Sequence, residues 1–220
     1  MPARKRRFAR RDSDAQLELA RAVQHSLLPP PLASTARFEL ATGFAPAQVV
    51  AGDFYDYFQP QPDLVGFYLV DVQGKGLEGA MYAALVSGIM RGLQKSGTPP
   101  ARLLELLNRR LCLRPIPNKF CVLAYVLLDL AQNTLTYASA GTPFPLLLRG
   151  GTTTRIELPG FPLGLFADAS YEQQEVRLQP GDFVLFDHVV GAPHARLLAV
   201  GAPDGAERTV LRAAADRLDR

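Results

Sequence analysis

The chain contains little cysteine and no long apolar run, and each absence excludes a class of protein. Its two cysteines, Cys112 and Cys121, lie on apolar segments without CxxC spacing, which argues against a zinc site or a dithiol redox motif. No stretch of about 18 apolar residues occurs, and no apolar core follows the basic start, so neither a membrane span nor a secretory signal is predicted. We therefore expect a soluble, cytoplasmic protein with reduced cysteines and no membrane partner.

Positive charge is concentrated at the N-terminus. Six Arg and Lys residues precede position 12 with no acid among them, and without these six charges the formal net charge of +3 becomes −3. Such a tail can contact nucleic acid or anionic lipid, although a solvated, disordered segment over residues 1–11 is the simpler interpretation. Because no element that reads bases accompanies the tail, a nucleic-acid partner is not expected.

Periodicity divides the rest of the chain into a helix and a mixed domain. Apolar residues recur at helical spacing over residues 12–28, and three prolines then stop the helix, so residues 12–31 are interpreted as an amphipathic linker helix and residues 32–220 as one domain. Two further helices are expected over residues 76–94 and 100–113. Strands are expected over residues 38–44, 54–58, 65–71, 120–128, 134–139, 145–149, 153–158, 171–178 and 183–190. Strands on either side of two adjacent helices predict an α+β fold with an antiparallel sandwich.

Two aspartates, Asp53 and Asp71, lie eighteen residues apart, each beside a glycine-containing turn. Asp71 follows the short apolar run of residues 65–70, which is typical of a buried strand. A carboxylate in such a place is costly unless it is paired or binds a metal, and no basic residue lies within four positions before Asp71 or three after it. Carboxylates on turns suit Mg²⁺ or Mn²⁺. The alternative is a pair of aspartates that only form turns.

Six short motifs extend this pattern along the chain. They are Gln24-x-x-Leu27-Leu28-Pro29, Ala51-Gly52-Asp53-Phe54-Tyr55-Asp56, Asp71-Val72-Gln73-Gly74-Lys75-Gly76, Ser139-Ala140-Gly141, Pro162-Leu163-Gly164 and Pro180-Gly181-Asp182. In order and spacing they resemble the SpoIIE/RsbU branch of the metal-dependent (PPM, type 2C) serine/threonine phosphatases, and the resemblance runs from about residue 17 to residue 186. It implies two antiparallel β-sheets stacked face to face with helices outside.

The resemblance also implies a site for phosphoester hydrolysis that holds two Mn²⁺ or Mg²⁺ ions. Asp53 and Asp71 would be the catalytic metal ligands, with Asp71 bridging the two ions and the backbone carbonyl of Val72 as a third ligand. Asp56 would orient a metal-bound water from outside the ligand shell, and the stabilisation of a turn is the alternative for this residue.

The partners follow from the same resemblance. The substrate would be a phosphorylated protein of the anti-sigma-factor antagonist type, within bacterial partner-switching signalling in a stress or developmental response. The helix over residues 12–31 is expected either to form a homodimer or to pack on the catalytic domain, because its apolar stripe would otherwise be exposed.

The second metal position departs from the family pattern. Where the family has Thr-Asp-Gly, this chain has Asp187-His188-Val189, and a shift of one residue turns a strand side chain to the opposite face. Residues 196–220 contain no Asp-Asp strand, so the fold is expected to lack its last strand and to hold only one complete ion position, with Asp187 or His188 as the candidate for a further ligand. Val122 and Thr142 replace a Thr and a His of the family. Two interpretations stay open: an active phosphatase, or an impaired pseudophosphatase that serves as a protein-binding module.

Overall fold

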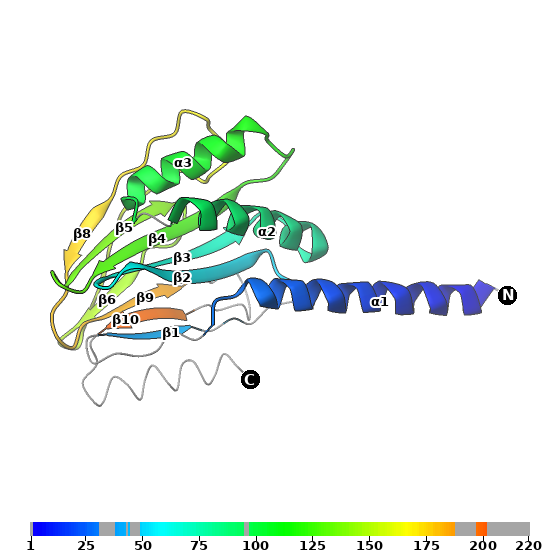
Figure 1. Cartoon of the computed structure of the whole chain (residues 1–220), viewed down its shortest axis with the longest axis horizontal. Helices are drawn as coiled ribbons and strands as arrows, with labels where there is room; N and C mark the ends of the chain where they lie inside the picture. The colour runs from blue at the N-terminus through cyan, green and yellow to red at the C-terminus, as the bar shows by residue number, and fades with distance from the viewer. Residues whose placement is uncertain are drawn as a thin grey trace.

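The computed structural model describes the backbone of residues 2–30, 38–42, 44, 49–94, 97–187 and 197–201, and within these ranges the side chains of residues 15–186. Two five-stranded antiparallel sheets lie face to face, and helices α2 (Gly76–Leu93) and α3 (Pro100–Leu113) cover one of them (Figure 1). Helix α1 (Pro2–Leu27) extends away from the sandwich (Figure 1). The predicted α+β sandwich is confirmed.

All neighbouring strands in both sheets are antiparallel. Sheet A has the order β1 (Glu39–Thr42), β10 (Leu197–Gly201), β9 (Phe183–Asp187), β6 (Leu146–Arg149) and β7 (Thr152–Arg155). Sheet B has the order β2 (Asp53–Gln61), β3 (Leu64–Val72), β4 (Cys121–Asp129), β5 (Thr134–Ala140) and β8 (Gln174–Arg177). Four strands of sheet B, β2 to β5, are therefore consecutive along the chain apart from the two helices, and β8 joins the sheet after β6 and β7 of sheet A.

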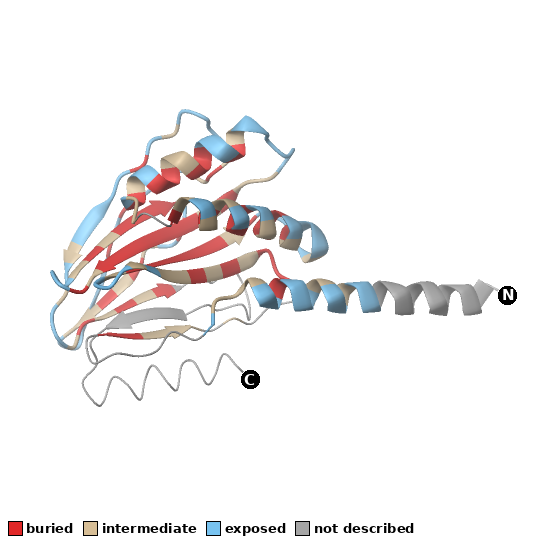
Figure 2. Ribbon diagram, in the orientation of Figure 1, coloured by how far each residue is buried: buried red, intermediate tan, exposed pale blue. Residues whose placement is uncertain are grey.

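Strand β3 is apolar on both faces because it is covered on both sides. Successive strand residues point to opposite faces, so Val65 and Phe67 pack in the core between the sheets, whereas Tyr68 and Val70 pack in the second core under the helices. The red ribbon of the central strands in Figure 2 shows this double burial. Helix α3 contributes Leu107, which is fully buried, and such burial stabilises the fold by about 1.5–3 kcal/mol.

The expected elements agree with the structure apart from their ends. Helix α3 has the expected bounds, and α2 ends one residue earlier than expected. Strands β7 and β8 are shorter than the expected segments 153–158 and 171–178. The segment expected over residues 183–190 forms β9 as far as Asp187, and its remainder lies outside the described residues.

The N-terminal segment differs from the expectation. Residues 1–11 were expected to be disordered and the helix to begin near Asp12, but α1 begins at Pro2. Arg, Lys and Ala are good helix formers, and the segment after Pro2 contains neither glycine nor proline. The helix can therefore extend toward the N-terminus as far as Pro2. Its end at Leu27, shortly before the prolines, is as expected. Among the described residues, no helix has the length and apolar character needed to cross a membrane.

Sheet A also differs from the expectation of a missing last strand. The short apolar stretch after β9 forms β10, which pairs with β9 on one side and β1 on the other. Its sequence, Leu-Leu-Ala-Val-Gly, contains no acid. Sheet A therefore contains a strand after β9 that was not expected, and this strand carries no acidic pair.

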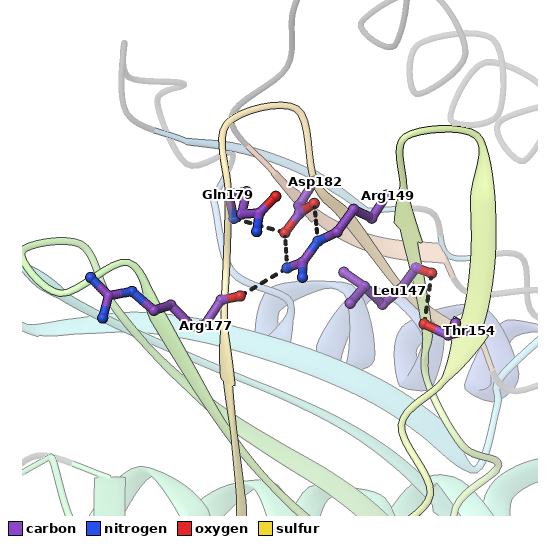
Figure 3. Close-up of polar contacts among 6 residues, drawn as sticks. All are labelled: Leu147, Arg149, Thr154, Arg177, Gln179 and Asp182. Carbon is purple, nitrogen blue, oxygen red and sulfur yellow. Dashed lines mark hydrogen bonds and ion pairs between the residues drawn. The ribbon is translucent and has the colours of Figure 1, made fainter.

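The Pro180-Gly181-Asp182 motif has a structural role in this sandwich. The side chain of Asp182, 2% exposed, accepts hydrogen bonds from Arg149 Nε at 2.8 Å and Nη2 at 2.5 Å, and from the backbone N–H of Gln179 at 2.7 Å (Figure 3). Arg149 also donates to the carbonyl of Arg177 at 2.8 Å. The guanidinium thus ties β6 to the β8–β9 turn.

Asp182→Asn is expected to destabilise the fold by about 1–2 kcal/mol, since a hydrogen-bonded charge is lost from a buried position while Arg149 stays partly exposed. Burial alone would raise the pKa of Asp182, but the bonds from Arg149 and Gln179 together with the positive charge hold it below its usual value. The stabilisation is therefore complete at neutral pH and is lost as the pH falls through the folded-state pKa.

Urea unfolding of wild type and Asp182→Asn at pH 7 and pH 3 measures this effect. The difference in midpoint should be present at pH 7 and should shrink at pH 3. The exposed Asp168→Asn should change the midpoint little at either pH. A difference that grows on acidification would contradict the assigned ion pair.

Candidate functional site

The structure places Asp53 and Asp71 directly opposite each other. They are Cα partners in the antiparallel pair β2 and β3, and this register continues without interruption from Asp53 to Phe58. Directly opposed residues point to the same face, with Cβ atoms about 4.5–5.5 Å apart. On β3 this is the face of Phe67, which packs between the two sheets. The two carboxylates predicted as metal ligands are therefore brought together at the end of sheet B.

Glycines allow the backbone to pack tightly around this pair. The N–H of Val72 donates to the carbonyl of Gly52 at 3.3 Å. A Cβ on Gly52 would lie 3.1 Å from the carbonyl oxygen of Val72 and 3.0 Å from that of Gly74, so any side chain there would crowd both. The Val72 carbonyl thus lies beside Gly52, the residue before Asp53, and its role as a metal ligand stays a prediction. Carboxylate and carbonyl oxygens are the donors that Mg²⁺ and Mn²⁺ prefer, so this group of residues fits one such ion.

Gly79→Ala should disturb this packing. A Cβ on Gly79 would lie 2.7 Å from the carbonyl oxygen of Gly74 and 3.3 Å from the Cα of Gly52, and because both are backbone atoms the turns must shift. We expect a loss of about 1–3 kcal/mol in the free energy of unfolding.

Gly88→Ala is the matched control, because Gly88 lies on the same helix and a Cβ there would meet nothing within 4 Å. This substitution should stabilise the protein by about 0.5–1 kcal/mol through helix propensity alone. Thermal unfolding of both variants compares them. Equal stability of the two would contradict the close approach of α2 to the glycine turns.

Asp56 does not join the pair. It is partnered with Tyr68 in the β2–β3 register, so its side chain lies on the helix-covered face, opposite to Asp53. There it is 5% exposed, forms an ion pair of 3.1 Å with Arg91 Nε, and accepts hydrogen bonds from the hydroxyl of Tyr68 at 3.3 Å and the N–H of Tyr57 at 2.9 Å. Burial raises the pKa of Asp56, although Arg91 opposes the shift. The expected role in orienting a metal-bound water is not supported, since a three-residue offset on a strand changes the face.

Lys119 is a charged neighbour of the site that sequence reasoning missed. Its side chain is 8% exposed, donates to the carbonyl of Gln73 at 3.2 Å and pairs with Glu78 at 2.8 Å. Its Nζ also lies 2.7 Å from where a Cβ on Gly74 would be. Lys119 follows the left-handed Asn118 in the loop between α3 and β4, so no local pattern indicates that it reaches the turn after β3.

On the β4 side, the residue beside Asp71 is apolar. Asp71 pairs on its other side with Val122 of β4, so Asp53, Asp71 and Val122 form one row across three strands. A valine offers no hydroxyl to a carboxylate or a bound water. The other replaced residue, Thr142, is 9% exposed and shares a 2.9 Å hydrogen bond with the hydroxyl of Ser139. Neither residue adds a metal ligand to the site.

The candidates for the second metal position stay predictions. Asp187 ends β9, where its Cα partner is Leu197 of β10, and its side chain and all of His188 lie outside the described residues. Within the described part of the chain, no group of three or more His, Cys, Asp or Glu side chains could hold a metal ion. The described site therefore consists of two carboxylates and one carbonyl.

Comparison with known proteins places this arrangement in a family. The family model "Stage II sporulation protein E (SpoIIE)" matches residues 61–186. The phosphoserine phosphatase RsbU of Bacillus subtilis is 27% identical over 173 residues, which cover 78% of this chain and 51% of RsbU. The chain thus spans about half the length of that relative.

Solved structures show the same fold. The SiaA-PP2C domain of Pseudomonas aeruginosa aligns with a TM-score of 0.70 at 19% identity, covering 97% of this chain and 84% of that domain. RsbX, solved in complex with magnesium, aligns with a TM-score of 0.57 at 11% identity over 74% of this chain and 92% of RsbX. Because the family model covers more than half of the chain and the sandwich agrees with these structures, the chain belongs to the SpoIIE family, in the SpoIIE/RsbU branch of the PP2C-type (PPM) serine/threonine phosphatases.

Proposed function

We propose that this chain hydrolyses phosphoserine or phosphothreonine on a regulatory protein, with Asp53, Asp71 and the Val72 carbonyl as metal ligands. The observation that supports this most is the opposed pair Asp53 and Asp71 at the end of sheet B. Divalent ions bound there supply charge neutralisation at phosphorus and lower the pKa of a bound water to near neutral.

The chain's own residues pre-organise this site. Asp71 is fixed on β3, which is paired along its whole length with β4, so its position is set before any ligand arrives. Two opposed carboxylates repel each other and favour a cation between them. Lys119 adds a positive charge beside the turn that follows Asp71, where it holds the Gln73 carbonyl. The strand pairing and this contact together keep the ligand oxygens in place for an ion.

The competing proposal is a pseudophosphatase that binds partners without efficient turnover. The described residues contain no third acid grouped with Asp53 and Asp71, and Val122 occupies the neighbouring place in the row, which favours this alternative.

Calorimetric titration with Mn²⁺, combined with phosphopeptide hydrolysis, separates the two proposals. An active phosphatase should bind two ions and turn over the phosphopeptide. One weak site or none, without turnover, would support the binding module instead. A site with affinity for Mg²⁺ as well as Mn²⁺ would indicate an all-oxygen ligand set, since histidine suits Mn²⁺ better than Mg²⁺.

The substrate class that we propose is a phosphorylated anti-sigma-factor antagonist in a cytoplasmic partner-switching system, by similarity to RsbU, which is named a phosphoserine phosphatase. Incubating the protein with Mn²⁺ and the serine-phosphorylated antagonist, followed by mass spectrometry, tests it. Loss of about 80 Da, the mass of HPO₃, from the phosphoserine is the expected result. A generic phosphopeptide that is hydrolysed equally fast would argue against selectivity for this partner.

We also propose that α1 forms a homodimer. Leu19 and Val23 on this helix are 68% and 61% exposed, whereas Leu28 after the helix packs on the catalytic domain. Leu19→Glu with Val23→Glu should lower the mass measured by light scattering to that of a monomer, because charges would replace the apolar contact. Leu113→Glu, at a similarly exposed apolar position on α3, should leave the mass unchanged. A wild type that is already monomeric would contradict the dimer.

A further inference from the structure

The side chain of Gln24 on α1 is buried against the turn that carries Asp53. It is 7% exposed, its Nε2 donates to the carbonyl of Ala51 at 2.5 Å, and its Oε1 accepts from the N–H of Ala51 at 2.9 Å. Both backbone polar groups of Ala51 are thus satisfied by one amide side chain that lies 27 residues earlier in the chain. Gln24 therefore pairs with Ala51 as a neighbouring strand would.

Within the part of the chain that the structure describes, no strand residue pairs with Ala51. Ala51 and Gly52 precede β2. In this segment the carbonyl of Gly52 accepts a hydrogen bond from the N–H of Val72, and the side chain of Gln24 accepts one from the N–H of Ala51. Asp53 is the next residue. Its backbone is therefore placed by two contacts, one from β3 and one from α1, and buried backbone groups that lose a partner cost free energy and shift to regain one.

The end of α1 is fastened at a second point. Arg91 of α2 donates from Nη2 to the carbonyl of Leu27 at 2.5 Å and from Nε to Asp56 at 3.1 Å. The buried carboxylate of Asp56 thus orients Arg91, and Arg91 in turn binds a carbonyl in the last turn of α1. Because α1 is held at Leu27, the amide of Gln24 is presented to Ala51 in a fixed position.

We propose that Gln24 is a positioning residue for Asp53, and that its contact with Ala51 sets the affinity of the Asp53 and Asp71 pair for a divalent ion. The inference rests on the proposed metal-binding function of that pair. Gln24 bonds the backbone two residues before Asp53 and not the carboxylate itself. Loss of a partner that directly orients a metal ligand typically reduces metal affinity by about 10–100-fold, and we expect an effect at the lower end of this range.

Gln24→Met tests the proposal, because methionine keeps the length of the side chain and removes both hydrogen bonds. In the metal-free protein, hydrogen exchange at the Ala51 amide should become faster, since its acceptor is lost. Calorimetry should show an affinity for Mn²⁺ lower by at least about tenfold. Gln16→Met on the exposed face of the same helix is the matched control and should change neither quantity.

A second control separates positioning from general loss of stability. Leu28→Ala removes an apolar contact with the core and leaves the bonds of Ala51 in place, so it should lower the free energy of unfolding and leave Mn²⁺ affinity nearly unchanged. An equal loss of affinity in Leu28→Ala and Gln24→Met would show that Gln24 is only structural.

The outcomes also distinguish this inference from the proposed function. If wild type and Gln24→Met bind Mn²⁺ equally well, Gln24 has no positioning role, but the proposed metal site is still supported. A wild type that binds no Mn²⁺ would overturn both, since Gln24 would then have no ligand to position. Unchanged exchange at Ala51 in Gln24→Met would show that the contact does not exist in solution.

Discussion

Asp71→Asn is expected to reduce Mn²⁺ affinity by more than about 100-fold, because a neutral amide oxygen binds a hard dication far more weakly than a carboxylate does. Turnover of a phosphopeptide should fall by about 1,000-fold, since several kcal/mol of charge stabilisation at phosphorus would be lost. Stability in the absence of metal should hold or rise. Asp71 faces Asp53 directly across the β2–β3 pair, and directly opposed like charges destabilise a sheet.

A control substitution is available at the opposite end of the β2–β3 hairpin. Asp63 lies in the turn between β2 and β3, so Asp63→Asn makes the same chemical change away from the pair. It should leave Mn²⁺ affinity and turnover unchanged. Calorimetry and urea unfolding of the two variants without and with Mn²⁺ give the comparison. Wild-type affinity in Asp71→Asn would remove Asp71 from the metal site.

Restoring the family's acid at the second metal position is expected to raise turnover by at least about tenfold. His188→Asp with Val189→Gly recreates the Asp-Gly that the family carries after the Pro-Gly-Asp turn and its strand, and each ~1.4 kcal/mol of added charge stabilisation multiplies the rate about tenfold. Recovery should be partial and clearest with Mn²⁺, because β10 has no acid to add to the site.

Phosphopeptide hydrolysis by this double variant and by wild type, over a range of Mn²⁺ concentrations, is the measurement. His194→Asp with Val190→Gly makes the same two chemical changes a few residues away in the sequence, so it controls for added charge and added backbone freedom and should have no effect. Brisk turnover by wild type, with no gain in the first double variant, would show that Asp187 or His188 already completes the site.

The sequence by itself determined the sandwich, and the family resemblance of its motifs implied that Asp53 and Asp71 meet. Strands β2 to β5 are consecutive apart from two helices, and their apolar patterns are strong, so neighbours along the chain are neighbours in the sheet. The turn at Pro62 and Asp63 joins β2 to β3, but the register shifts between Phe58 and Gln61, so the pairing of the two aspartates depends on this shift as well as on the turn. The order of these strands follows the order of the chain, which is why residue patterns suffice to predict it, whereas the register shift was not predicted from the sequence.

The tertiary structure alone decided what surrounds the pair. Asp56 belongs to the same motif as Asp53, yet its side chain faces α2, where Arg91 is available as a partner. Lys119 and Gln24 contact the two turns of the site from 46 and 27 residues away. Such contacts depend on how closely α1, α2 and the loop before β4 approach the sheet. The distances between these elements are set by how whole helices and sheets pack against one another, and no periodicity or motif in the sequence predicts them.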